Sequence, residues 1–105
     1  MAITQQTIQQ VWQKTQYVDP QNEANGFRKD QCGAWIQWMQ YGNRGSVYGW
    51  EIDHITPVSR GGSDQVSNLR PLHWENNAAR SDGRLVCVVT SSGTSNVANR
   101  VPAYL

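Results

Sequence analysis

Residues 50–83 read WEIDHITPVSRGGSDQVSNLRPLHWENNAARSDG, and this stretch carries the strongest structural pattern in the chain. Residues 50–55 alternate like a short strand that ends just before a proline. A glycine-rich loop follows, and residues 69–72 fit a second short strand. Residues 73–81 favour a helix, with Gly83 just beyond its end. The stretch therefore predicts a strand, a loop, a second strand and a helix, in that order.

Towards the N-terminus, residues 4–18 have the spacing of an amphipathic helix. Thr4 is one candidate for its N-cap, and a capping box of Thr7 with Gln10 is the other. The side chains that recur at helical spacing on one face are Ile8, Val11, Trp12 and Thr15.

The flanking segments predict shorter elements. An Asp-Pro pair at 19–20 is expected to end the first helix, because the residue before proline avoids the α region. Residues 21–26 read as a loop, and residues 27–41 as short regular pieces around an irregular centre. The β-branched run at 84–90 predicts a strand, and the Ser/Asn/Gly-rich tail, residues 91–105, reads as loose chain as far as Val101. We therefore predict an α+β fold, in which an N-terminal helix and a C-terminal strand flank the core motif.

Composition limits the classes of protein that this chain can represent. Its 105 residues suit a single domain, 1–105, and its 9 basic and 8 acidic side chains leave a formal charge of +1. This balance excludes a polybasic binder. No apolar run approaches the ~20 residues that cross a bilayer, and the N-terminus is polar. We expect no membrane contact and a cytoplasmic location.

The candidate catalytic, metal-binding and phosphate-binding residues lie between positions 53 and 80. Asp53 and His54 stand side by side at a predicted strand end, Asn68 follows a loop, and Asn77 and Arg80 share one helical face. Hydrolysis of a phosphodiester needs a base, and imidazole has a suitable proton affinity near neutral pH. A carboxylate and an amide can hold a hard divalent cation, and a guanidinium can hold a phosphate oxygen.

These motifs together resemble the HNH endonuclease family, in the variant whose third letter is Asn. The resemblance is close over residues 50–83 and weaker back to residue 32. It implies a ββα-metal fold, in which a twisted hairpin and one helix hold a metal ion between them. The motifs that carry it are Glu51-Ile-Asp-His-Ile-Thr-Pro, Gly61-Gly62-Ser-Asp, Asn68-Leu-Arg-Pro-Leu and Asn76-Asn77-Ala-Ala-Arg80-Ser-Asp.

Carried over by position, the resemblance implies a role for each residue of the motif. His54 is the general base, and Asn68 orients its imidazole and braces the loop. Asp53 is one metal ligand and Asn77 the other, with Asn76 as the alternative for that position. Strict alternation would send Asp53 and His54 to opposite faces, so the strand is expected to end or twist there. Arg80 matches the phosphate-contacting position, and Arg70 and Arg84 are further candidates for phosphate contact.

The chain departs from many family members in its cysteines. Where two Cys-x-x-Cys pairs would hold a structural zinc, only Cys32 and His73 are credible ligands, so no structural zinc is expected. We expect Trp35 and Trp74 to fill that space instead. The two cysteines, Cys32 and Cys87, read most simply as free buried thiols, with a disulfide as the alternative in an exported protein. The five tryptophans read as core residues, with base stacking as the less favoured alternative.

The sequence thus predicts a metal-dependent endonuclease that hydrolyses DNA phosphodiester bonds with little sequence specificity. The family resemblance implies one divalent ion, Mg²⁺ first, with Mn²⁺ or Ni²⁺ as substitutes. DNA is the expected partner. The alternatives are a catalytically weak nucleic-acid-binding module of the same fold, and the nuclease domain of an antibacterial toxin with a small immunity protein as its partner.

Overall fold

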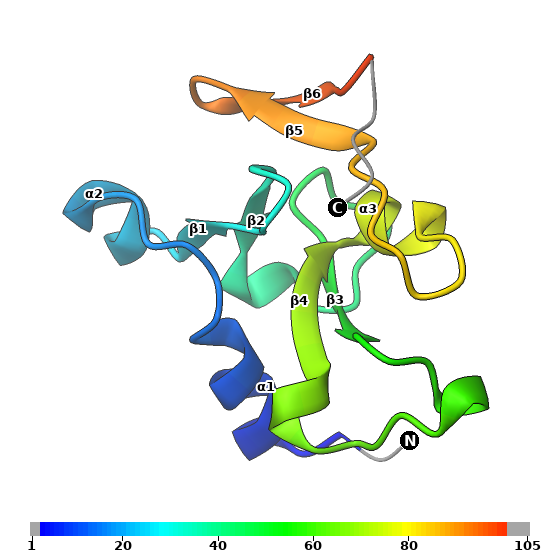
Figure 1. The fold of residues 1–105 in the computed structure, drawn as a ribbon. Coiled ribbons are helices and arrows are strands. Elements are labelled where there is room, and N and C mark those ends of the chain that lie inside the picture. The colour runs from blue at the N-terminus through cyan, green and yellow to red at the C-terminus, as the bar shows by residue number, and fades with distance from the viewer. Residues whose placement is uncertain (1–2, 101–105) are drawn as a thin grey trace.

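The computed structural model describes residues 3–100 and has a mixed α+β architecture with three two-stranded antiparallel sheets over that range (Figure 1). Within these residues no helix is long and apolar enough to span a bilayer. The helices are α1 (Gln5–Trp12), α2 (Pro20–Ala24) and α3 (Trp74–Ala79), and the strands are β1 (Phe27–Lys29), β2 (Trp35–Gln37), β3 (Trp50–His54), β4 (Leu69–His73), β5 (Val89–Ser92) and β6 (Ser95–Ala98).

The hairpin of β3 and β4 lies at the centre of the molecule and leads directly into α3 (Figure 1). The strands pair in antiparallel register, with Asp53 opposite Arg70. The side chain of His73 caps α3, because its Nδ1 accepts a hydrogen bond from the backbone N–H of Glu75. The predicted order of strand, loop, strand and helix is confirmed, although the helix ends two residues earlier than expected, at Ala79.

Helix α1 packs against β4 through a cluster of indole rings. Val11 and Trp12 are buried, and the Trp12 ring lies 5.6 Å from that of Trp38 and 5.1 Å from that of Trp50. Leu69 of β4 completes this cluster. The expectation that tryptophans form core is confirmed at Trp12, Trp35 and Trp50, which are all buried.

The structure decides both ends of α1. Thr4 is the N-cap, because its hydroxyl oxygen accepts a hydrogen bond from the backbone N–H of Thr7 at 3.1 Å. The helix stops at Trp12 rather than at residue 18, because Gln16 leaves it to form a backbone pair with Lys29. Tertiary pairing therefore overrides the helical spacing of the last third of this segment.

Residues 20–24 form α2, so the predicted loop at 21–26 is wrong. Asp19 caps this helix by accepting a hydrogen bond from the backbone N–H of Asn22 at 2.8 Å. Pro20 occupies the first turn, where the missing N–H leaves no hydrogen bond unmade. The Asp-Pro pair thus begins a helix. The short regular pieces predicted within residues 27–41 are confirmed as β1 and β2.

The strand predicted at 84–90 is mostly wrong, because β5 begins only at Val89. The backbone N–H groups of Val88 and Val89 donate instead to Oδ1 of Asn76, each at 2.9 Å. The following chain is more ordered than expected, since β6 pairs with β5. The predicted end of the loose stretch, at Val101, lies outside the described residues.

A buried carboxylate, Asp30, ties the turn between β1 and β2 to α3. Its Oδ1 accepts hydrogen bonds from the backbone N–H groups of Cys32 and Ala34. Its Oδ2 accepts from the backbone N–H of His73 and from the side-chain amide of Asn76. Burial raises the pKa of Asp30, and these four donors act in the opposite direction. Asn76 is therefore a structural residue, fully committed to the buried network.

We expect Asp30→Asn to lower the free energy of unfolding by roughly 3 kcal/mol, because an amide group would then face backbone donors in the core. Urea unfolding of both proteins measures this loss. Asp82→Asn is the matched control, since Asp82 is exposed and its ion pair with Arg60 is worth at most about 1 kcal/mol. Equal losses in the two variants would contradict the assigned role of Asp30.

Cys32 and Cys87 form a disulfide, with Cα atoms 5.4 Å apart. The interpretation of two free thiols is therefore wrong, and the alternative holds. The bridge packs with Leu72 and Leu85 in a second small core. It joins the turn before β2 to the segment before β5. One segment that precedes the central hairpin and one that follows it are therefore linked beside Leu72 of β4.

The tryptophans expected to fill the place of a zinc site pack elsewhere. The indole N–H of Trp35 donates to the carbonyl of Gly93, and its ring meets Phe27 edge-on. Trp74 stacks on His73 and donates to the carbonyl of Ser46. The predicted aromatic filling is wrong, because the disulfide and the Asp30 network link these segments instead.

Candidate functional site

Asp53 lies in the middle of the hairpin as a buried carboxylate between two guanidinium groups. Its side chain is 1% exposed. Nε of Arg70 donates to Oδ2 at 2.8 Å, and Nε of Arg80 is 2.9 Å from Oδ1. Arg70 reaches it from the paired position on β4, and Arg80 from the end of α3. Two charge partners explain how an acid can be buried at the centre of the hairpin.

Asn77 projects from α3 towards β3. Its side-chain amide donates to Oε1 of Glu51 at 2.8 Å. Glu51 is also held by Arg44 in a two-pronged ion pair, at 2.7 and 2.8 Å, and this pairing lowers the pKa of the glutamate. Oδ1 of Asn77 is the one buried side-chain polar atom without a hydrogen-bond partner in residues 3–100. A buried amide oxygen in this state is suited to accept a ligand.

His54 is the last residue of β3. The strand therefore ends at the Asp53-His54 pair, as expected from the alternation of side chains along a strand. Its Nε2 lies 2.7 Å from Oδ1 of Asp64, which is in the loop between β3 and β4. The histidine side chain is 16% exposed and the aspartate 59%. With the N–H at Nε2 directed to the carboxylate, the lone pair of the ring lies on Nδ1. Asp64 belongs to the Gly61-Gly62-Ser-Asp motif, but the sequence assigned it no role, because an acidic residue in a glycine-rich loop is common.

Asn68 holds the loop between β3 and β4 closed. Its Oδ1 accepts a hydrogen bond from the backbone N–H of Thr56 at 2.8 Å. Its Nδ2 donates to the carbonyls of Thr56 and Ser63, at 3.1 and 2.8 Å. Gly62 is required here, because a Cβ atom would lie 1.8 Å from the carbonyl oxygen of Thr56. These contacts fix the conformation of the loop, which places Asp64 beside His54.

A hollow of about 460 Å³ opens beside Asn77 and Arg80. Its wall includes the two-residue turn of Asp82 and Gly83, both of which have positive φ angles of 55° and 80°. A Cβ atom at Gly83 would lie 2.9 Å from Cδ of Pro57, so the turn packs closely on the loop after β3. The side chains that line this hollow include Arg44, Ser59, Asn77, Arg80 and Asp82.

The arginines predicted to contact phosphate have different surroundings. Arg70 and Arg80 are both paired with Asp53. Arg84 lines a second hollow, of about 310 Å³, together with Arg60 and Asp82. Asp82 lines both hollows, so polar surface with arginine side chains continues from one to the other.

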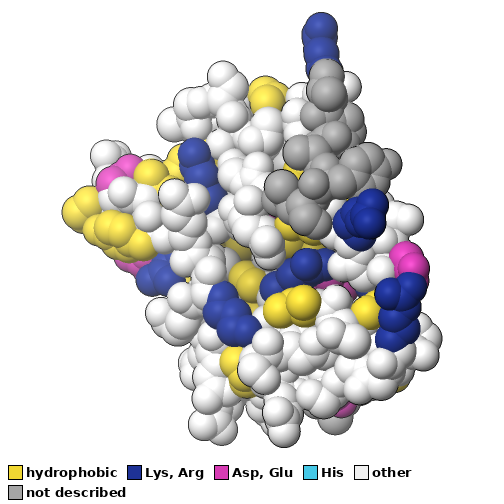
Figure 2. All heavy atoms as spheres, viewed as in Figure 1, with side chains coloured by type: hydrophobic (Ala, Val, Ile, Leu, Met, Phe, Trp, Pro, Cys, Tyr) yellow, Lys and Arg dark blue, Asp and Glu magenta, His cyan; other side chains and the backbone are white. Residues whose placement is uncertain are grey.

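Positive side chains also gather on one face of the molecule. Figure 2 shows Lys and Arg side chains spread over α1, β1 and the segment that follows α3, with few Asp or Glu side chains among them. Because the chain carries a formal charge of only +1, this face is more basic than the composition suggests. Such a face suits a polyanionic partner.

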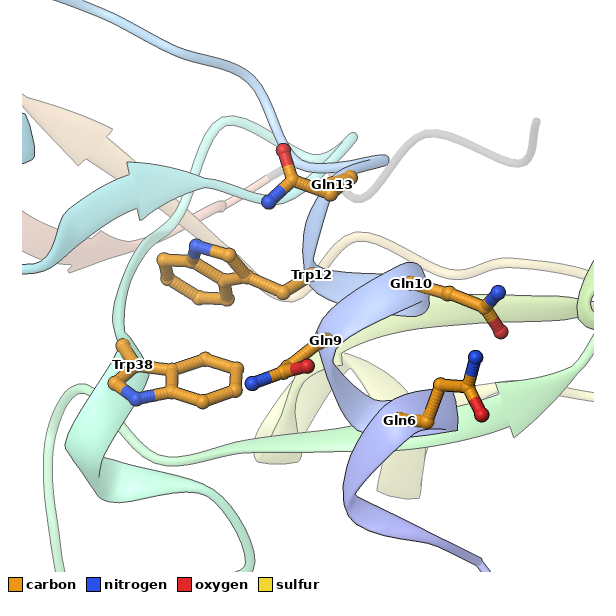
Figure 3. A pocket seen from close by; sticks show the side chains of 6 residues that line it. All are labelled: Gln6, Gln9, Gln10, Trp12, Gln13 and Trp38. Atoms are coloured by element: carbon orange, nitrogen blue, oxygen red, sulfur yellow. The ribbon is translucent and has the colours of Figure 1, made fainter.

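A groove of about 590 Å³ lies between α1 and Trp38 (Figure 3) and is larger than either hollow. Trp12 and Trp38 lie on the same side of the helix there. The groove has no charged side chain in its lining, so it offers neither a carboxylate for a metal ion nor a cationic group for a phosphate. Its other lining residues are Gln6, Gln9, Gln10 and Gln13.

The described residues hold few donors for a metal ion. Across residues 3–100, no three side chains of His, Cys, Asp or Glu gather closely enough to hold one. Cys32 is bonded to Cys87, and Nε2 of His73 lies 2.8 Å from the carbonyl oxygen of Val47. The oxygens near the hairpin that suit a hard cation include those of Asp53 and Asn77, one carboxylate and one amide, and the carboxylate of Glu51, which is paired with Arg44 and Asn77.

Comparison with known proteins gives one match. Residues 32–83 match the family model of the HNH endonuclease. No curated protein and no solved structure matches this chain. The matched segment covers β3 and β4, the loop between them, and α3, and so includes Asp53, His54, Asn68, Asn77 and Arg80, whereas Arg84 lies just beyond it. Residues 32–83 of this chain belong to the HNH endonuclease family, whose members are generally nucleases.

Proposed function

We propose that this protein is a divalent-metal-dependent endonuclease that hydrolyses phosphodiester bonds in DNA with little sequence specificity. The observation that carries the proposal is Asn77 Oδ1, a buried oxygen without a partner beside the hairpin that presents Asp53 and His54. β3, β4 and α3 would then form the ββα-metal core of the family. No element of the described chain is a separate base-reading module, which favours contacts to the DNA backbone.

The donor set fits a hard divalent cation. Oδ1 of Asn77 lacks a partner, and the Asp53 carboxylate supplies the negative charge. Oxygen donors of this kind suit Mg²⁺, with Mn²⁺ or Ni²⁺ as substitutes. A bound ion supplies Lewis-acid stabilisation of the charge on the phosphate and on the leaving oxygen. Asp53 and Asn77 are therefore proposed as its two protein ligands.

His54 is proposed as the general base. Asp64 accepts the N–H at Nε2, so Nδ1 keeps the lone pair that takes a proton from the attacking water. The imidazolium formed in this step is stabilised by the same carboxylate. Asn68 positions the group indirectly, because its three hydrogen bonds hold the loop that carries Asp64.

Arginines near the site are proposed to hold the phosphates of the substrate. Arg80 lines the first hollow and Arg84 the second. Arg70 is paired with the carboxylate of Asp53. The chain has little excess positive charge, so its affinity for DNA depends on these few groups and on the ion. Binding is expected to weaken steeply with salt, because each phosphate contact releases counterions.

The direct test is the nicking of supercoiled plasmid by the purified protein with Mg²⁺ or Mn²⁺. EDTA should stop the reaction, and Asn77→Ala should weaken the apparent affinity for the ion by roughly 10- to 100-fold. Asn25→Ala, at the exposed end of α2, is the matched control and should behave like the wild type. Cleavage that survives EDTA would overturn the metal proposal. Intact plasmid with a clear mobility shift would identify a binding module instead.

A second candidate function is the nuclease domain of an exported antibacterial toxin. The Cys32–Cys87 disulfide favours it, because such bonds persist in oxidising compartments and are rare in the cytosol. This observation also argues against the expected cytoplasmic location. Expression in the cytosol of a bacterial host tests the idea. Loss of viability with the wild type but not with His54→Ala supports a toxin, and equal growth of the two strains rejects it.

A further inference from the structure

We propose that Arg80 is an exchangeable counter-ion of Asp53. In the structure its guanidinium pairs with Oδ1 of the carboxylate, 2.9 Å away. Binding of a divalent cation by Asp53 and Asn77 releases Arg80 into the adjoining hollow, where it can hold a phosphate. This inference rests on the metal site of the proposed function and adds to it a competition between a side chain and the ion.

Arg70 is the fixed partner of the same carboxylate. It stands opposite Asp53 in the strand pair, and its side chain is 11% exposed. Its Nη2 also donates to the carbonyl of Gly83 at 3.0 Å, so two bonds in different directions hold the guanidinium. Displacing Arg70 would break the hairpin packing and the turn after α3 together. This group therefore remains with Asp53 whether or not a cation is bound.

Arg80 is held much less firmly. It lies just past α3, with extended rather than helical backbone angles, and its side chain is 36% exposed. It also lines the hollow that contains Asn77. A side chain on the rim of an open hollow can leave a carboxylate without opening the core, because water is available to both groups.

The local charges supply the reason for the exchange. One carboxylate balanced by two guanidinium groups already has an excess positive charge of one, and a divalent cation would raise that excess to three. Repulsion in a partly buried site of this kind favours release of the more mobile cation. Asn77, whose buried Oδ1 has no partner, lines the same hollow as Arg80, so the ion and the released Arg80 would face one substrate.

Calorimetric titration with Mn²⁺ tests the competition without relying on cleavage. We expect Arg80→Gln to bind Mn²⁺ roughly tenfold more tightly than the wild type, the size typical of coupled binding events. Arg60→Gln is the matched control, because it removes the same charge from the neighbouring hollow without contacting Asp53. It should stay within about twofold of the wild type, since exposed charges are screened. Arg80→Lys keeps the charge and should lie between the two.

A second measurement uses the wild type alone. The ¹H–¹⁵N signals of the arginine Nε groups can be followed during titration with Mg²⁺. The Arg80 signal should move to a position typical of a solvated guanidinium, while that of Arg70 should keep its hydrogen-bonded shift. The side-chain amide of Asn77 should respond over the same range of concentration.

The outcomes separate this inference from the proposed function. Tighter Mn²⁺ binding by Arg80→Gln alone, with movement of the Arg80 signal, supports the exchange. Unchanged or weaker binding by Arg80→Gln, while Asn77→Ala loses binding, overturns the exchange and leaves the metal site intact. Absence of binding in the wild type and in Arg80→Gln overturns both.

Discussion

His54→Ala is expected to lower the rate of plasmid nicking by roughly 100- to 10,000-fold, the usual contribution of a general base. The histidine ends β3 beside the hairpin carboxylate, and Asp64 holds its Nε2 at 2.7 Å. Alanine removes the only imidazole in this part of the described chain, and His73 cannot replace it, because both of its ring nitrogens lie within hydrogen-bond distance of backbone groups. Single-turnover rates at saturating Mg²⁺ measure the loss.

The controls for this prediction distinguish chemistry from folding. His54 is at a strand end and is partly exposed, so the variant should retain the unfolding midpoint of the wild type within a few degrees. Asp64→Asn should cause a smaller fall in rate, because it leaves the imidazole in place and removes only its orienting charge. A His54→Ala protein that is folded and still cleaves at the wild-type rate would exclude His54 as the base.

Removal of the disulfide is expected to have the largest effect on stability. The double variant Cys32→Ala/Cys87→Ala should lose about 4 kcal/mol, because the bridge closes a loop across a sequence separation of 55 residues. Both cysteines are changed together so that no free thiol remains. Urea unfolding under non-reducing conditions measures the loss, and the buried contacts with Leu72 and Leu85 add to it.

Reduction provides an independent test of the same bond. Dithiothreitol should bring the wild type down to the stability of the double variant, and it should leave the double variant unchanged. If reduction has no effect on the wild type, the two cysteines are not bonded in solution. The double variant should still nick plasmid at low temperature, because neither cysteine is among the side-chain partners of Asp53 and His54.

The central hairpin and its helix could be predicted because their signals are local. The alternation of residues 50–55, the proline after it and the helix-forming run after residue 73 each act over a few neighbours. The same reasoning failed at 84–90, where β-branched residues suggested a strand. There the backbone N–H groups of Val88 and Val89 donate hydrogen bonds to the side chain of Asn76. No local sequence pattern predicts that partner.

The candidate site also has features that the sequence predicts and features that depend on packing. The identities of Asp53, His54, Asn68, Asn77 and Arg80 follow from the order and spacing of one continuous motif. The hydrogen-bond and ion-pair partners of these side chains do not follow from the motif. That Asp53 is buried between two arginines, and that Asn77 keeps one oxygen without a partner, depends on how β3, β4 and α3 pack together.

The sequence by itself therefore determined the family and the order of the core elements, and it supplied the residues proposed to carry the chemistry, because short-range spacing records all three. Only the tertiary structure decided the Cys32–Cys87 bond, the Asp30 network and the second partner of Asp53. Asp30 and Asn76 are 46 residues apart, and the cysteines 55. Contacts over such separations arise from packing, and the periodicity of helices and strands contains no signal for them.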